Sequence, residues 1–390
     1  MLPVSMKGMV IFMKKALSLV LTIAMLLAMA TMGVSVSAAS NSAFDKETFR
    51  ISASTILYDN IDNSGGSSGN AFCYADKYGT GRNDQGDFAC YPDVDFGSKG
   101  ASKVTVNFGF HNPEKYAETT FAVYIDNPYG NPVASFTVKK GETNGSEIVN
   151  HKEFTANCTV AAGKHDVYVM ATNQASGSFD YIYFTEAAAT IKTTKTVANQ
   201  IKYPSLDPFA GLKVLDATTQ VVDQINTKDK GGSGKSIAKM DANGVGYSSM
   251  DDMIIFPNCN FGKTGAKEIS IDFSYGNNDN SHATLGVFID NPYGTPVATL
   301  ECGYSGGWEL TKAKTFTAAL DAAKVGAGSH TVIIRFMTEK SGSFNNVKFT
   351  AGDKDLTQTA SAAATPDFIL VPVVTAVASL AGVVISKRKH

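Results

Sequence analysis

The chain has 390 residues, of which 34 are Lys or Arg and 36 are Asp or Glu, so its formal net charge is −2. The charges are spread without long runs, and no basic stripe offers a surface for nucleic acid, so nucleic acid is excluded as a partner. Hydrophobic residues make up 44% of the chain, which is ample for two domains of ordinary size.

The N-terminal end predicts export. Lys14 and Lys15 precede an apolar run without charge over residues 16–32, and small residues follow at 35–39 (SVSAA). A basic start, an apolar middle and a small-residue exit are typical of a secretory signal peptide. We therefore interpret residues 1–39 as a signal peptide.

The next feature in the chain is a long internal repeat. Residues 125–134 (IDNPYGNPVA) recur as residues 289–298 (IDNPYGTPVA), an offset of 164 residues (289 − 125). Solenoid repeats are about 20 to 50 residues long, so a repeat of this length is a duplicated domain. We predict two modules, residues 44–187 and 205–351, and a flexible linker over residues 188–204, which are rich in Ala, Thr and Lys.

Short alternating segments fill both modules. Residues 104–108 (VTVNF) and 269–273 (ISIDF) alternate apolar and polar side chains with the period of a strand, and no segment carries a helical stripe over three turns. The Asn-Pro-Tyr-Gly of the repeat fits a type I turn and is interpreted as scaffold. His165 and His330 follow glycines and are interpreted as side chains at strand edges, without a catalytic role.

The C-terminal end predicts a membrane tether. After a polar spacer at 352–367, residues 368–385 are uncharged and apolar, near the lower limit for spanning a bilayer, and the basic tail 386–390 favours the cytoplasmic side. The arrangement resembles the sorting signal of Gram-positive surface proteins. That family carries a Leu-Pro-x-Thr-Gly motif, whereas residues 365–367 here are TPD. We therefore expect a transmembrane helix that anchors the chain at the cell surface, without sortase attachment.

The five cysteines are Cys73, Cys90, Cys158, Cys259 and Cys302. Their spacing fits no metal site, and none recurs at the same place in both modules, so no shared disulfide framework is predicted. A Cys73–Cys90 disulfide and five buried thiols are both compatible with the sequence.

The order of these segments resembles the family 6 carbohydrate-binding modules, twice over. The matching segments of the first module are 86–91, 94–97, 162–165 and 179–184. The matching segments of the second are 244–247, 256–262, 306–308, 326–330 and 344–349. The resemblance implies an all-β fold of two tandem jelly-roll β-sandwiches.

It also implies non-catalytic binding of a polysaccharide or glycan. In such modules a sugar ring lies between two aromatic side chains at the loop end of the sandwich, and an Asn near the last strand bonds its hydroxyls. Tyr247 and Trp308 match the two aromatic positions of the second module. Ser343 stands at the Asn position, with Asn345 and Asn346 as nearby amides. We therefore expect binding chiefly through the second module.

The first module matches these positions less well. Its tryptophan position falls near Ser146, Ser178 stands at the Asn position, and Tyr74 and Tyr78 are candidates for the first aromatic. The family also tends to hold a structural calcium, for which Asp216 and Asp180 are the candidate ligands. Each module keeps about one anionic ligand, so no cofactor is predicted.

An enzyme and a structural surface protein are the two alternatives to a sugar-binding protein. A glycosidase needs two carboxylates that flank one bond, but the adjacent Asp251 and Asp252 would point to opposite faces of a strand, so an enzyme is not predicted. The alternative is a structural or adhesive surface protein whose sandwiches no longer bind sugar. The serines at the Asn positions favour that alternative.

Overall fold

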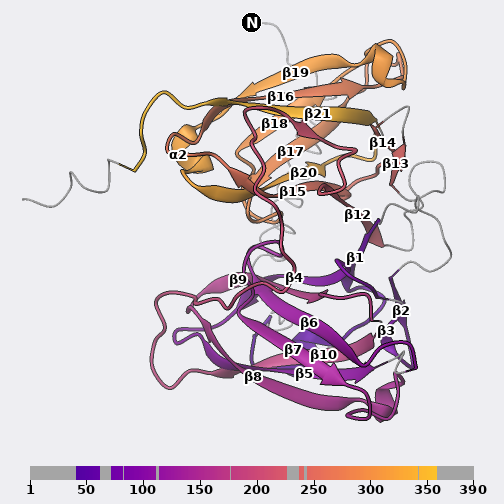
Figure 1. The fold of residues 1–390 in the computed structure, drawn as a ribbon, viewed down its shortest axis with the longest axis vertical. Helices are drawn as coiled ribbons and strands as arrows, with labels where there is room; N and C mark the ends of the chain where they lie inside the picture. The colour runs from indigo at the N-terminus through magenta and orange to yellow at the C-terminus, as the bar shows by residue number, and fades with distance from the viewer. Residues whose placement is uncertain are drawn as a thin grey trace, which may run out of the picture.

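The computed structural model describes residues 41–61, 72–81, 83–110, 114–175, 177–225, 237–240, 244–340 and 342–357. This part of the chain is all-β and forms two sandwiches, module 1 (purple) and module 2 (orange) in Figure 1. The predicted signal peptide, transmembrane helix and basic tail lie outside the described residues. Within the described ranges, no helix has the length and apolar character needed to cross a bilayer.

Module 1 packs a five-stranded layer on a three-stranded one. The first layer is β1 (Ile56–Asn60), β4 (Phe88–Asp95), β9 (Lys164–Ala171), β6 (Glu118–Ile125) and β7 (Ala134–Lys139). The second is β10 (Gly177–Glu186), β5 (Ala101–Phe110) and β8 (Lys152–Val160), and a hairpin of β2 (Cys73–Ala75) and β3 (Gly79–Gly81) lies beside it. The short 3-10 helices are η1 (Lys46–Phe49) and η2 (Ile148–Asn150).

Module 2 repeats this order. Its first layer is β12 (Gln220–Ile225), β15 (Met253–Asn260), β20 (Ser329–Phe336), β17 (Ala283–Ile289) and β18 (Ala298–Cys302). Its second layer is β13 (Ala238–Met240), β14 (Gly244–Gly246), β21 (Ser343–Ala351), β16 (Ala266–Ser274) and β19 (Lys314–Ala319), with β11 (Leu212–Lys213) beside β21. The remaining elements are η3 (Leu310–Lys312) and α2 (Ala322–Val325). The equivalent strand order confirms the duplication.

The predicted strands form the cores. Val104, Val106 and Phe108 of β5 enter the core of module 1, because alternate residues of a strand face the same side. Ile269 and Ile271 of β16 do the same in module 2. One face of each of these strands is therefore apolar, and the two layers of each sandwich pack with their apolar faces toward each other.

The repeated phrase forms the predicted turn in both modules. Asp126 and Asp290 begin it with φ of 63° and 65°, a left-handed conformation that Asp tolerates better than most residues. The carboxamide oxygen of Asn127 then accepts the amide of Tyr129 at 3.0 Å, and Asn291 repeats the bond in module 2. Side-chain bonds of this kind mimic a backbone turn and fix its shape.

The two modules share one sheet, which the sequence analysis did not predict. β1 pairs antiparallel with β12, so the first layers join into a ten-stranded sheet. Asp59 lies opposite Asp223, its equivalent 164 residues later (223 − 59). A pseudo-two-fold axis therefore passes through this pair, and the two modules are related by a half-turn.

The outer faces of the two first layers pack against each other and form a third core, the seam. Its buried members come from both modules: Tyr58, Phe88, Cys90, Ala122, Tyr124, Tyr129, Tyr168, Met170, Val222, Met253, Ile255, Phe288 and Ile333. The hydroxyls of Tyr58 and Tyr293 bond at 2.6 Å across it. The repeated turn joins the modules further, because Asn127 donates to Asp290 at 3.0 Å and Asn291 donates to Asp166 at 2.8 Å.

The linker follows the surface of both modules, which differs from the expected flexible spacer. The amide of Lys195 donates to Thr159 at 2.9 Å, and that of Val197 donates to Pro132 at 2.7 Å. The buried side chain of Asn199 donates to the carbonyl of Gly130 at 2.6 Å. These bonds hold the segment in place, although its composition lacks an apolar periodicity.

Candidate functional site

Trp308 lies at one end of module 2, in the loop between β18 and η3. Its side chain remains 39% exposed, and its ring meets Tyr275 edge-on at 5.5 Å between centroids. Gly276 makes room for the indole, because a Cβ at that position would lie 2.3 Å from the indole nitrogen. The indole of Trp308 is therefore supported on one side by Gly276 and Tyr275 and is open to solvent on the other. The sequence alone did not establish this exposure.

Hydrogen bonds fix the loop that carries Trp308. The amide of Ser305 donates to the carbonyl of Tyr275 at 3.0 Å, and the hydroxyl of Ser305 accepts the amide of Tyr275 at 2.9 Å. The hydroxyl of Tyr275, which belongs to a buried residue, lies 2.6 Å from that of Ser281. A rigid loop loses little conformational entropy when a ligand binds.

The ends of β16 and β21 lie next to this loop. Ser274 of β16 donates its hydroxyl to the carbonyl of Glu309 at 2.9 Å, directly after Trp308 in the chain. Across the strand pair, Ser274 lies opposite Ser343. Ser343 is 4% exposed, so its hydroxyl is at the floor of this end of the module rather than on its surface.

Tyr247 lies at the same end of the module. Its neighbour Ser248 bonds both the amide and the carbonyl of Gly342, at 3.3 and 3.4 Å, just before Ser343 in β21. Tyr247 is half-buried with φ of 59°, a conformation uncommon for a bulky residue. β14 ends directly before Tyr247, and β19 begins six residues after Trp308 (314 − 308). These two strands are separated by β21 and β16, so their backbones lie about 14 Å apart at the usual strand spacing. Tyr247 and Trp308 thus flank the paired ends of β16 and β21.

One of the two predicted amides, that of Asn346, is bonded to neighbouring side chains. Asn346 donates to Asp272 at 2.9 Å and accepts the amine of Lys213 at 2.7 Å, so its side chain is engaged on the sheet away from Trp308. Asn345 occupies a bulge of β21, and its carbonyl accepts the amide of Val214 at 2.8 Å. The side chain of Asn346 is therefore engaged with Asp272 and Lys213, and that of Asn345 stays a predicted sugar contact.

Two exposed residues near Trp308 were missed in the sequence. Tyr304 is 41% exposed and lies four positions before Trp308 in the same loop. Asn277 is exposed and follows Gly276, and its amide donates to the hydroxyl of Tyr275 at 3.4 Å. The glycines of residues 303–307 (GYSGG) between the two aromatic residues were the available signal, because such a loop lies at the surface.

The same end of module 1 is closed. The carbonyl of Ser146, at the tryptophan position, accepts the hydroxyl of Ser178 at 2.6 Å and lies 2.8 Å from Nε2 of His151. The other ring nitrogen of His151 lies 3.0 Å from the side-chain oxygen of Asn107. Gly109 lies under the imidazole, much as Gly276 lies under Trp308. Burial lowers the pKa of His151, which favours the neutral form of the imidazole at this end.

Tyr74 and Tyr78, the alternatives for the first aromatic position of module 1, both belong to the β2–β3 hairpin. Tyr74 packs against the core, and a hydrogen bond to Asp76 raises its pKa. The ring of Tyr78 carries the amine of Lys77 at 4.9 Å from its centroid. Lys77 also pairs with Glu147 at 2.6 Å, which ties the β2–β3 hairpin to the loop at Ser146.

The calcium candidates do not fit a metal ion. Asp180 is 3% exposed and accepts the guanidinium of Arg50 at 2.5 Å, so an organic cation already balances its charge. Asp216 accepts the amide and the hydroxyl of Thr218 at 2.9 and 2.8 Å. Among the residues that the structure describes, no three His, Cys, Asp or Glu side chains gather as ligands. A hard cation needs several oxygens, preferably charged ones, and each of these two residues offers one carboxylate.

The cysteines are all free thiols. Cys73 is half-exposed on β2, whereas Cys90 lies in the seam, so the Cys73–Cys90 disulfide is not formed. Cys158, Cys259 and Cys302 are buried in the module cores. Four of the five therefore behave as small hydrophobic residues.

A family model described as carbohydrate binding module (family 6) matches residues 56–186 and again residues 221–364, which are the two sandwiches. The chain belongs to the family 6 carbohydrate-binding modules. The tandem modules expected from the sequence are thereby confirmed, and so is their class, a carbohydrate-binding module without catalytic activity of its own. No protein of curated function matches the chain.

Three of the solved structures similar to the chain each correspond to about one module. A module from Clostridium stercorarium in complex with cellobiose is 16% identical, covers 38% of this chain and 98% of its own, and has a TM-score of 0.27. A β-1,3-glucan-binding module from Bacillus halodurans is 18% identical, covers 38% and 100%, and has the same TM-score of 0.27. A module from Clostridium cellulolyticum in complex with xylose is 14% identical, covers 37% and 99%, and also scores 0.27.

Proposed function

We propose that this protein binds a polysaccharide or glycan without cleaving it, chiefly through the loop end of module 2. The observation that supports this most is Trp308, an indole supported by Gly276 and Tyr275 from behind and open to solvent in front. Pyranose rings present apolar C–H faces that suit the negative face of an aromatic ring. Tyr247 is the second aromatic residue of the proposed site.

The sugar's hydroxyls need new partners when water leaves them. Asn277, whose amide donates to Tyr275 behind the indole, and the hydroxyl of Ser343 are proposed as partners, and the exposed ring of Tyr304 adds apolar surface. The family Asn is missing, so fewer directed bonds hold the sugar. We therefore expect weak binding to a chain of sugars rather than tight binding to one unit.

Module 1 is proposed to act as a structural partner. Its loop end is filled by His151, and it packs on module 2 through the seam. This observation favours the second candidate function, a structural surface protein, for module 1 alone.

We also propose that the chain as a whole does not catalyse a reaction. Asp251 is engaged by the guanidinium of Arg335. Asp252 is buried and accepts the amides of Gln224 and Ser249 at 3.0 and 2.7 Å. Neither carboxylate of this adjacent pair is available to flank a glycosidic bond, as a hydrolase would require.

The cellular location is proposed from the sequence. The signal peptide of residues 1–39 and the apolar segment 368–385 would export the chain and tether it to the membrane at the cell surface. There the modules would hold glycan close to the cell.

Affinity electrophoresis tests the proposed function. The purified chain is run through native gels that contain xylan, β-1,3-glucan, cellulose derivatives, pectin or mannan, beside a protein that does not bind sugars. We expect retardation in at least one gel, increasing with polysaccharide concentration. Equal mobility in every gel, for a chain shown to be folded by its thermal transition, would contradict sugar binding.

A further inference from the structure

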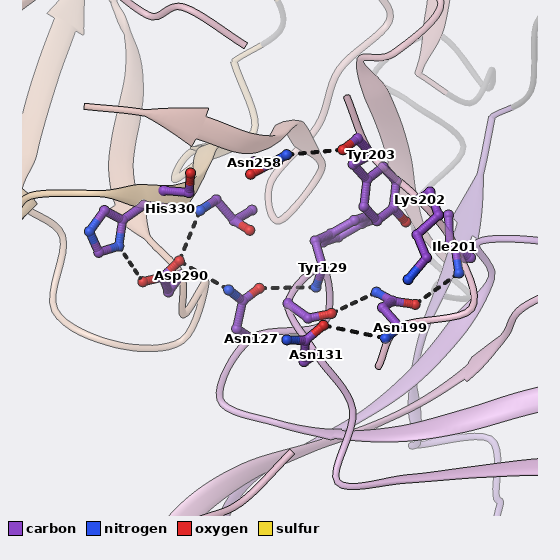
Figure 2. Close-up of a pocket in the computed structure, with 13 residues that line it drawn as sticks. Asn127, Tyr129, Asn131, Asn199, Ile201, Lys202, Tyr203, Asn258, Asp290 and His330 are labelled. Carbon is purple, nitrogen blue, oxygen red and sulfur yellow. Dashed lines mark hydrogen bonds and ion pairs between the residues drawn. The ribbon is translucent and has the colours of Figure 1, made fainter. Parts of the chain in front are cut away.

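A cavity of about 300 Å³ lies at the seam, on the side of the linker. Figure 2 shows its wall. There Asp290 of module 2 lies between His330, which is also in module 2, and Asn127, which comes from module 1. We call it the linker-side cavity. A second cavity of about 370 Å³ lies where the pseudo-two-fold axis places its equivalent, and we call it the opposite cavity.

The two cavities share a frame inherited from the duplication. Asp290 and His330 bond at 2.8 Å in the linker-side cavity, and their equivalents Asp126 and His165 bond at 2.8 Å in the opposite cavity. Each cavity is also lined by the Asn of the other module's repeated turn. Differences between the cavities therefore arose after duplication, on one common scaffold.

The differences concern charge. The opposite cavity is lined by Asp93, Asp166 and Lys164, and the amine of Lys164 pairs with Asp93 at 2.7 Å. The equivalent residues of the linker-side cavity are Asn258, Thr331 and Ser329, all of them neutral. The linker-side cavity therefore lacks two carboxylates and one internal ion pair that the opposite cavity has.

The linker adds a cation to this cavity. Lys202 is exposed at its edge, and no carboxylate pairs with its amine among the described residues. Asp290 accepts from His330, Asn127 and the amide of Thr331, and it forms no ion pair with Lys202. Beyond the Asp290–His330 pair, the lining of the linker-side cavity thus carries one positive charge, whereas the opposite cavity retains the carboxylate of Asp166.

The remaining lining offers groups for a polyhydroxylated ligand. Asn131 uses its side-chain oxygen to accept the amide of Asn199 at 3.3 Å, which leaves its NH₂ group to donate. Asn258 donates to the carbonyl of Tyr203 at 2.9 Å, which leaves its oxygen to accept. Ser329 is exposed and makes no hydrogen bond through its side chain within the described ranges. Tyr203 adds an aromatic ring to the same wall.

We propose that the linker-side cavity binds a single acidic sugar, with its carboxylate on Lys202 and its hydroxyls on Asn131, Asn258 and Ser329. The volume is at the lower end of the roughly 300–1,000 Å³ of small-molecule sites, which suits one sugar unit rather than a chain. This site is separate from the loop end of module 2, and it rests on the divergence of the two cavities rather than on Trp308.

Calorimetric titration of the full chain with methyl glucuronide and with methyl glucoside tests the proposal. The charged sugar should bind about tenfold more tightly than its neutral counterpart, because one charge-assisted hydrogen bond contributes roughly that factor. Lys202→Gln should remove the difference between the two sugars. Lys192→Gln, which changes an exposed linker lysine outside the cavity, should leave it unchanged.

A double variant, Asn258→Asp with Ser329→Lys, recreates the ion pair of the opposite cavity and should abolish binding of the glucuronide. Asp tolerates the left-handed conformation of position 258, since Asp93 has it in module 1. Trp308→Ala should leave glucuronide binding intact. Glucuronide binding lost in Trp308→Ala but kept in Lys202→Gln would overturn this inference while supporting the loop-end site. Failure of polysaccharide retardation with the cavity variants behaving as expected would overturn only the loop-end site.

Discussion

Replacing Trp308 with alanine should remove most of the affinity for polysaccharide. A Trp side chain presents up to ~250 Å², and because Trp308 is 39% exposed, ~100 Å² of it is open to a ligand. A sugar that covers half of this area buries ~50 Å² of indole and a similar area of its own. At ~25 cal/mol per Å², the loss is ~2.5 kcal/mol, which corresponds to a roughly 70-fold weaker dissociation constant.

The assay is retardation in the polysaccharide gel that slows the wild-type chain, with the dissociation constant taken from mobility against polysaccharide concentration. Trp308→Phe should retain part of the affinity, because a smaller ring still covers Gly276. Val149→Ala is the matched control, since Val149 is an 86% exposed apolar residue in the equivalent loop region of module 1. Equal retardation of Trp308→Ala, Val149→Ala and the wild type would refute the assignment of the site to Trp308.

Three further predictions concern pH, calcium and thiols. Hydrogen bonds to aspartate raise the pKa of His165 and His330 above 6.5, so their stabilisation is full below that pH and is lost as the pH rises through the raised values. Replacing both with Asn should thus lower the urea midpoint more at about pH 5.5 than at about pH 9, and an equal loss at both would contradict this. Arg50→Gln should lower the free energy of unfolding by roughly 1–3 kcal/mol, because it leaves buried Asp180 without its partner. Neither added calcium nor a chelator should shift the melting temperature of the wild type. A thiol reagent should label Cys73 first in the folded chain and all five cysteines after unfolding without reductant, whereas fewer than five would indicate a disulfide.

The sandwich architecture was predictable because the strands of the second layers alternate. In residues 104–108 and 269–273 every second side chain enters a module core, so the pattern in the sequence matches burial on one face. The turn of the repeated phrase was predictable for a similar reason, since Pro, Gly and Asn act locally. These features depend on neighbours in the sequence and on little else.

The seam was missed, although the sequence carried a signal for it. Residues 167–170 (VYVM) are apolar at every position, and Val167 and Val169 enter the core of module 1 while Tyr168 and Met170 enter the seam. A strand that is apolar on both faces is covered on both faces. The partner that covers it cannot be identified from the pattern, because the contact depends on how β1 meets β12.

The positions of the two aromatic residues of the candidate site in the fold were predictable, whereas their surroundings were not. The family resemblance located Tyr247 and Trp308, and the structure brings both to the ends of β16 and β21. Whether the indole would be buried depended on Gly276, which lies under it from a different strand end. The closure of module 1 by His151 likewise depends on contacts between segments distant in the sequence, which periodicity does not reveal.

Trp308 is the only tryptophan in the chain, so its fluorescence reports the central claim directly. The chain is titrated with the polysaccharide that retards it and with one that does not. The account predicts a saturable change in tryptophan emission with the first, at the concentrations that retard the chain, and none with the second. Retardation without any change in emission would mean that the sugar binds away from Trp308 and would contradict the proposed site.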